Sequence, residues 1–196
     1  MVLTPSTMVP LGSSAPDFNL KDVVSGAPFS LASFASKKAL LVMFICRHCP
    51  YVQHIKDELT RLDKSYRGKD LALVGISSND ADNYPDDAPE SLRGFAVEQD
   101  WHFPFLYDAT QETAKIYTAA CTPDFFLYDA KRKLVYRGQL DDSRPGNGKP
   151  VTGKDLREAI DAVLADKPSP SVQKASIGCN IKWKKGQEPR YFGGAA

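Results

Sequence analysis

A continuous run of apolar residues over 40–45 predicts a central strand that is covered on both faces. Apolar residues then recur at helical spacing over 52–66, with charged residues between them. A second apolar run over 71–76 completes a strand–helix–strand unit, whose strands should be parallel and whose crossover should be right-handed. The first strand leads directly into Cys46 and Cys49, so this pair is expected at a strand-to-helix junction.

The pattern downstream predicts further strands and helices around the same sheet. Strands are expected over 103–107, 125–128 and 133–136, a helix opened by Asp87 with Glu90 as a capping box, a short helix from Asp108, and a helix with an apolar face over 156–164. The last two strands suit an antiparallel hairpin. The acidic loop over 80–87 and the basic patch over 182–185 are expected to be solvated. We therefore predict an α/β domain over 1–166 and an irregular C-terminal extension over 167–196.

Length and charge narrow the class of protein. A chain of 196 residues buries roughly 70% of the surface that its unfolded form exposes, so a core can form without disulfides or structural metals. The 25 Lys and Arg balance 24 Asp and Glu, and a net charge of +1 gives no general attraction to nucleic acid or membrane surfaces. The first twenty residues lack a signal-peptide pattern, and no later run is long enough to span a bilayer. A cytoplasmic protein is expected.

The two closely spaced cysteines indicate redox chemistry. The first turn of a helix leaves N–H groups unpaired and favours negative charge, which is expected to lower the pKa of Cys46. A thiolate attacks disulfides, and a second thiol one turn away can displace the mixed disulfide. Cys46 is therefore the predicted nucleophile and Cys49 the resolving thiol. Arg47 and His48 lie between them and add possible positive charge, which would stabilise the reduced thiolate and shift the pair toward being an oxidant.

The other two cysteines leave alternatives open. A zinc site usually has a second close pair of ligands, whereas Cys121 and Cys179 are single and distant in the sequence. Cys121 could be a third redox group or a metal ligand, and Cys179 could resolve an intermediate or bridge to Cys121. Simpler interpretations are a small buried thiol for Cys121 and a structural or incidental thiol for Cys179. Redox chemistry at the close pair is favoured over metal binding or inert thiols.

Three segments together resemble a known family: "SSAPDFNLKD", "LLVMFICRHCPYV" and "CTPDFFLYD". They are similar to the thioredoxin-like superfamily in its peroxiredoxin-related branch, the alkyl hydroperoxide reductase and thiol-specific antioxidant (AhpC/TSA) family. The resemblance covers residues 12–165. It implies a thioredoxin-like fold, a central mixed sheet flanked by helices, with an N-terminal β extension. It also implies that Cys46, Cys49 and Pro123 share one site and that the bond before Pro123 is cis.

The proline has a physical role apart from the resemblance. An X-Pro bond is the kind that adopts cis at low cost, and proline has no N–H. Thr122 and Pro123 could therefore expose a backbone edge beside the thiols, where a substrate strand could pair.

The chain departs from both family patterns. Thioredoxins usually have a Trp before the first Cys of the pair and a buried acidic residue nearby. Here Ile45 precedes Cys46, and the strand over 40–45 holds no acidic residue. Proton transfer must then use another group or water. If Cys49 takes the peroxidatic position, Val42 stands for the usual Pro and Cys46 for the usual Thr. Peroxide then loses a hydroxyl partner, so peroxidase chemistry ranks second.

The predicted activity is thiol-disulfide exchange with a redox-active Cys46–Cys49 disulfide, without another cofactor and without a metal. The predicted partner is a thiol or disulfide protein, or a small redox molecule. One alternative is a peroxiredoxin-like peroxidase that reduces peroxides. The other is a metal-binding protein or thiol redox sensor without enzymatic activity.

Overall fold

The computed structural model describes residues 3–192, and its centre is a mixed sheet of seven strands in the order β3-β2-β6-β5-β4-β8-β9. The strands are β2 (Asn19–Asp22), β3 (Pro28–Ser30), β4 (Ala39–Phe44), β5 (Leu71–Ser77), β6 (Phe105–Tyr107), β8 (Asp124–Tyr128) and β9 (Leu134–Gly138). β4 pairs parallel to β5 and antiparallel to β8, and β8 and β9 form the expected antiparallel hairpin. The thioredoxin-like mixed sheet is confirmed.

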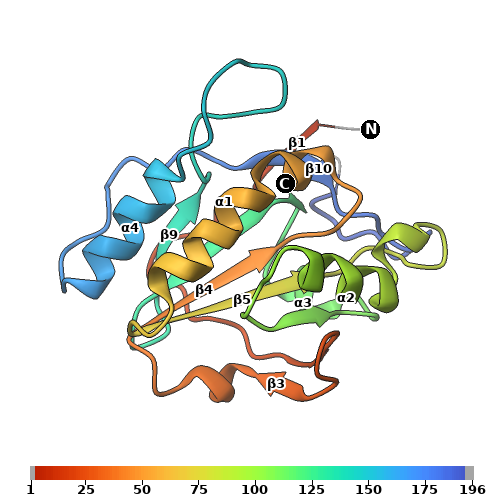
Figure 1. The fold of residues 1–196 in the computed structure, drawn as a ribbon, viewed down its shortest axis with the longest axis horizontal. Helices are drawn as coiled ribbons and strands as arrows, with labels where there is room; N and C mark the ends of the chain where they lie inside the picture. The colour runs from red at the N-terminus through yellow and green to blue at the C-terminus, as the bar shows by residue number, and fades with distance from the viewer. Residues whose placement is uncertain (1–2, 193–196) are drawn as a thin grey trace.

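The helices cover both faces of this sheet. Successive side chains of β4 point to opposite faces and all of them are apolar, so both faces must be buried. They are α1 (Pro50–Tyr66), α2 (Pro89–Glu98), α3 (Glu112–Ile116) and α4 (Lys154–Leu164), with short 3-10 turns at η1 (Leu31–Phe34) and η2 (Pro85–Asp87). Leu41 and Met43 pack in the core formed with α1, α2 and α4, whereas Val42 and Phe44 pack in the core formed with α3. Figure 1 shows α1 and α4 side by side over one face of the sheet.

The N-terminal β extension is also present. β2 pairs antiparallel with β3 and with β6, so the extension lengthens the sheet at the edge farthest from the hairpin. Within the described residues, 3–192, no helix is long and apolar enough to cross a membrane.

The C-terminal extension is mostly irregular, but it contains a strand that the sequence analysis did not predict. β10 (Ile177–Asn180) lies between β1 (Leu3–Pro5) and β7 (Cys121–Thr122) in a second, three-stranded sheet. The expectation that 182–185 is solvated is wrong at Trp183, which is 8% exposed and packs edge-on against Tyr191. These contacts join distant parts of the chain, and a four-residue strand is too short to show a clear period of its own.

Candidate functional site

The thiol pair lies against the loop between β7 and β8. The bond between Thr122 and Pro123 is cis, as the resemblance implies. Cys46 Sγ lies 3.3 Å from Thr122 Oγ1, and Cys49 Sγ lies 3.1 Å from the Thr122 carbonyl oxygen, to which the protonated thiol donates. Antiparallel pairing of β4 with β8 sets Phe44 opposite Asp124, so the end of one strand meets the start of the other. The structure thus brings Cys46, Cys49, Thr122 and Pro123 together.

Helix α1 begins at Pro50, directly after the pair, so neither cysteine lies within its first turn. Cys49 is its N-cap residue, and Cys46 lies before the helix; both thiols are fully buried. Hydrogen bonds from the Cys179 and Cys46 thiols, with a smaller one from the Val52 N–H, lower the pKa of Cys49 despite its burial. Burial, the Cys49 thiol and the Asp87 charge raise the pKa of Cys46. The prediction of a lowered pKa for Cys46 is therefore wrong, because Cys46 is fully buried and the neighbouring thiols stabilise the charge on Cys49 instead.

An aspartate from the acidic loop supplies the buried acid that β4 lacks. Asp87 is fully buried; its Oδ1 accepts the N–H groups of Arg47 at 2.7 Å and His48 at 3.2 Å. Its Oδ2 accepts from the Asn79 side-chain amide at 2.7 Å and pairs with His48 Nδ1. The expectation that Asp87 is solvated and caps a helix with Glu90 is wrong, since the N-cap of α2 is Ala88 and Asp87 faces the thiol motif.

The two charges stabilise each other. The hydrogen bond to Asp87 raises the pKa of His48, although partial burial opposes this. Burial alone would raise the pKa of Asp87, but the hydrogen bonds from His48 and Asn79 outweigh it and lower that pKa. Sequence reasoning missed Asp87 because nothing local marks it: the residue is 40 positions beyond Arg47. The pair can carry a proton beside Cys46.

Three donor groups of this cluster are close enough to hold a metal ion. One ligand atom each of Cys46, His48 and Asp87 lies within 4.8 Å of the others. Both oxygens of Asp87 already accept hydrogen bonds, however, and the pairing with His48 uses Nδ1. The geometry suits a proton relay to the thiol at least as well as a ligand set.

A polar pocket lies beside His48. Its lining includes Arg47, His48 and Lys56, with Glu98 from the end of α2. The Arg47 guanidinium donates to the Ser91 hydroxyl on α2, so this side chain is held against that helix. The ring of His48 stacks on Tyr84 with centroids 5.5 Å apart. Arg47 and His48 thus line a polar pocket next to the thiol motif, on the side of α2.

The backbone edge at Thr122 is already occupied. β10 pairs with β7, with Cys179 directly opposite Thr122 and Asn180 opposite Cys121. The expected edge for a substrate strand is therefore covered by the chain's own C-terminal extension. Because directly opposite residues share a face and neighbours alternate, Cys179 lies on the Thr122 face and Cys121 on the other.

Cys121 is a buried thiol outside the pair. Its Sγ lies 3.6 Å from the Pro123 carbonyl oxygen, and burial, with the nearby Asp124 charge, raises its pKa well above the usual value. A protonated thiol in this environment is a poor nucleophile. The bridge to Cys179 considered above is also disfavoured, since the two residues lie on opposite faces of their strands.

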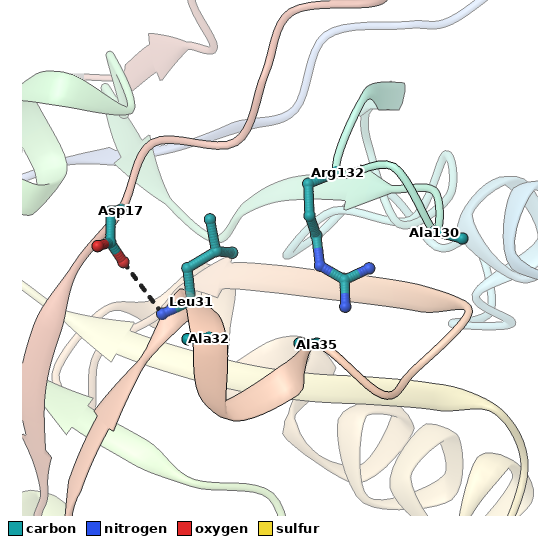
Figure 2. A pocket seen from close by; sticks show the side chains of 6 residues that line it. All are labelled: Asp17, Leu31, Ala32, Ala35, Ala130 and Arg132. Atoms are coloured by element: carbon teal, nitrogen blue, oxygen red, sulfur yellow. Dashed lines mark hydrogen bonds between the residues drawn. The ribbon is translucent and has the colours of Figure 1, made fainter.

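A second pocket lies near the N-terminal extension (Figure 2), lined by Asp17, Leu31, Ala32, Ala35, Ala130 and Arg132. The Asp17 carboxylate accepts the Leu31 N–H at 3.2 Å. The Arg132 guanidinium donates to the carbonyls of Phe34 and Lys37. These polar groups have partners within the protein, and the pocket lacks a thiol, so we assign it no part in the chemistry.

The chain is similar to known proteins over most of its length. A model of the AhpC/TSA family matches residues 11–137. A crystal structure of an uncharacterized conserved protein from Geobacillus kaustophilus is 52% identical, with a TM-score of 0.93 over 95% of this chain and 98% of that one. A hypothetical protein from Sinorhizobium meliloti 1021 is 51% identical, with a TM-score of 0.92 over 93% of this chain and 100% of that one.

More distant structures share the fold alone. A putative thiol:disulfide interchange protein DsbE from Chlorobium tepidum is 19% identical, with a TM-score of 0.63 over 80% of this chain and 99% of that one. Peroxidoxin BcpB from Mycobacterium tuberculosis is 21% identical, with a TM-score of 0.53 over 64% of this chain and 82% of that one. No curated protein matches the chain.

Proposed function

Because the chain belongs to the AhpC/TSA family, a family of thiol redox and peroxidase proteins, we propose that it is a thiol-disulfide oxidoreductase. Its redox centre is the Cys46–Cys49 pair, and its partner is a thiol or disulfide compound. The observation that supports this most directly is the convergence of both thiols on Thr122, at 3.3 Å and 3.1 Å, beside the cis proline. Two thiols held on one residue are positioned for intramolecular exchange.

We assign the first attack to Cys49. Its thiolate is stabilised by neighbouring thiols and by the helix start, whereas the Cys46 thiol is kept protonated by burial. Cys49 attacks one sulfur of a substrate disulfide, the substrate S–S bond breaks, and one substrate thiolate leaves. This order reverses the roles predicted from the sequence.

Cys46 completes the reaction with help from His48. Protonated His48, held by Asp87, gives its proton to the departing thiolate and then takes the proton of Cys46. Cys46 attacks Cys49 Sγ, the Cys46–Cys49 bond forms, and the second substrate thiolate leaves. The substrate gains two electrons and the dithiol loses two. An external thiol reductant then restores the dithiol by the same exchange.

Serine variants test the proposal and the order of attack. In a Cys179→Ser background, which removes the thiol that contacts Cys49, we expect Cys46→Ser to accumulate a mixed disulfide on Cys49 with glutathione disulfide. Cys49→Ser should react slowly at neutral pH, and Cys121→Ser should exchange normally as the matched control. Peptide mass spectrometry reads each product. Catalytic turnover that survives in both Cys46→Ser and Cys49→Ser would overturn the proposal, and trapping on Cys46 alone would restore the predicted order.

Peroxide reduction is a second candidate, supported by the position of Cys49. This residue caps α1 and has a lowered pKa, as a peroxidatic thiol requires. Cys46 stands at the position where peroxiredoxins usually have a hydroxyl residue. The hydroxyl nearest to this position is Thr122 Oγ1, 3.3 Å from Cys46 Sγ. Fast sulfenic acid formation on Cys49 with micromolar peroxide, outpacing its reaction with glutathione disulfide, would favour the peroxidase. Slow oxidation would exclude it as the main activity.

A further inference from the structure

The C-terminal extension places a third thiol against the redox pair. β10 is hydrogen-bonded to β7, with Cys179 opposite Thr122, the residue that both Cys46 and Cys49 contact. Figure 1 shows β10 beside the start of α1, where Cys49 caps the helix. Cys179 is 1% exposed and belongs to the same buried cluster as the pair. Three thiols thus share one closed site.

Gly178 permits this close approach. A Cβ atom at this position would lie 2.0 Å from the Thr122 carbonyl oxygen and 3.2 Å from Pro123 Cδ. A contact of 2.0 Å with a backbone atom is impossible without a shift of the strand, so glycine is required for β10 to lie against the loop. The next residue, Cys179, lies on the Thr122 face, and its thiol hydrogen bonds to that of Cys49.

We propose that Cys179 is a third catalytic thiol that takes the disulfide over from the pair. Cys179 attacks Cys49 Sγ of the Cys46–Cys49 disulfide, the Cys49–Cys179 bond forms, and Cys46 leaves as a thiolate. The proton of Cys179 ends on Cys46, and one S–S bond replaces another, so no further oxidant is needed. The proposal rests on the proposed function only for the formation of the first disulfide from a substrate disulfide.

The electrostatics of the cluster give the order of events. In the reduced protein, the hydrogen bond to Cys49, burial and the Cys49 charge raise the pKa of Cys179 far above the usual value. This thiol therefore stays protonated and does not attack disulfides. Once Cys49 is part of a disulfide, its negative charge is gone and only burial remains as a major cause. The pKa of Cys179 then falls, with Lys182 acting in the same direction. Oxidation of the pair therefore activates the third thiol.

The consequence is a disulfide that joins the start of α1 to the C-terminal extension and releases Cys46 as a free thiol. The released thiol lies beside His48 and Asp87. Its sulfur and one ligand atom of each of these residues lie within 4.8 Å of one another. An external reductant would then meet a bond between Cys49 and Cys179 rather than the original pair.

Trypsin separates all the possible links, which makes the proposal directly testable. Cleavage after Arg47 divides the pair, and further Lys residues place Cys121 and Cys179 on two other peptides. Every disulfide among the four cysteines therefore joins two peptides of different mass. The reduced full chain is mixed with glutathione disulfide, quenched in acid at increasing times, alkylated, digested and analysed by mass spectrometry.

We expect the Cys46–Cys49 link to form first and the Cys49–Cys179 link to follow, while Cys46 becomes open to alkylation again. In Cys179→Ser the reaction should stop at Cys46–Cys49, with Cys46 blocked. Gly178→Ala keeps every thiol but displaces β10, and should reduce the yield of the second link on the order of tenfold. Cys121→Ser should behave as the wild type. Thermal unfolding shows whether each variant is folded.

The outcomes separate this proposal from the proposed function. If Cys46–Cys49 forms while Cys179 stays fully alkylatable, Cys179 is a structural thiol and the inference is overturned, although the oxidoreductase remains. A Cys121–Cys179 link in place of Cys49–Cys179 would also overturn it. If no Cys46–Cys49 link appears, the proposed function itself fails. In Cys46→Ser, a direct Cys49–Cys179 link supports the inference independently of the first disulfide, and a persistent glutathione adduct on Cys49 beside a free Cys179 contradicts it.

Discussion

The substitution Asp87→Asn tests whether one buried carboxylate organises the thiol site. Asp87 accepts the backbone N–H of Arg47 at 2.7 Å, that of His48 at 3.2 Å and the side-chain amide of Asn79 at 2.7 Å, and it pairs with the His48 ring. Asparagine keeps one acceptor oxygen. The new side-chain NH2 group would point either at the backbone N–H groups of Arg47 and His48 or at the side chains of Asn79 and His48. In either orientation, donor groups would face one another without an acceptor.

The expected loss of stability follows from these contacts. Hydrogen bonds to a charged group contribute about 1.5–3 kcal/mol each. Removing one partner of a buried ion pair costs about 3–5 kcal/mol. Because asparagine retains one acceptor, we expect the free energy of unfolding to fall by about 2–4 kcal/mol. For a chain of this size, that corresponds to a decrease in Tm of roughly 5–15 °C.

The loss should depend on pH in a defined window. The folded-state pKa of His48 is raised above its ordinary 6.5, so its contribution is complete below 6.5 and is lost as pH rises through the raised value. The folded-state pKa of Asp87 is lowered below its ordinary 3.8, so its contribution is complete above 3.8 and is lost as pH falls through the lowered value. The stability difference between the wild type and Asp87→Asn should therefore be largest between 3.8 and 6.5, and smaller at alkaline pH.

Urea unfolding of the reduced protein at several pH values measures this difference. Asp86→Asn is the matched control, since it removes the same charge from an exposed neighbour and should change stability by less than about 0.5 kcal/mol. The reasoning would be refuted if Asp87→Asn were as stable as Asp86→Asn, or if its destabilisation increased steadily toward alkaline pH.

Two further substitutions address the loop between β7 and β8, against which the thiol pair lies. Arg137→Met removes the partner of Asp124, and since both side chains are fully buried we expect a loss of about 3–5 kcal/mol in urea unfolding, against little change in exposed Lys131→Met. Equal stability of these two variants would contradict a structural role for the pair. Thr122→Val removes the hydroxyl that lowers the pKa of Cys46, so the step in which Cys46 attacks should slow roughly two- to tenfold in stopped-flow exchange. An unchanged rate would show that this hydroxyl does not assist Cys46.

The local pattern of the chain was sufficient for most of the main sheet. The apolar run over 40–45 corresponds to β4, and the helical spacing over 52–66 to α1, which begins only two residues earlier. The strands of the hairpin are β8 and β9. Such elements can be predicted because burial of one or both faces produces a regular spacing of apolar residues, and this spacing is visible in consecutive positions of the chain.

The details of the site depend on positions that no local pattern specifies. The charge lies on Cys49 rather than Cys46 mainly because Cys46 is buried and the distant Cys179 thiol hydrogen bonds to Cys49. The start of α1 is also weakly encoded, because Pro50 can occupy the first helical position. Asp87 reads as a capping residue in the sequence, but the backbone N–H groups of the thiol motif, together with His48, offered its carboxylate a stronger set of donors.

The sequence by itself determined the strand–helix–strand unit, the thiol pair at its junction and, through three motifs, the family. Only the tertiary structure decided which thiol holds the charge, which acid lies beside it, and that β10 with Cys179 covers the Thr122 edge. The physical reason is one of range. Periodicity reports burial among neighbouring residues, whereas a buried charge and a strand pairing depend on groups that the chain brings together from distant segments.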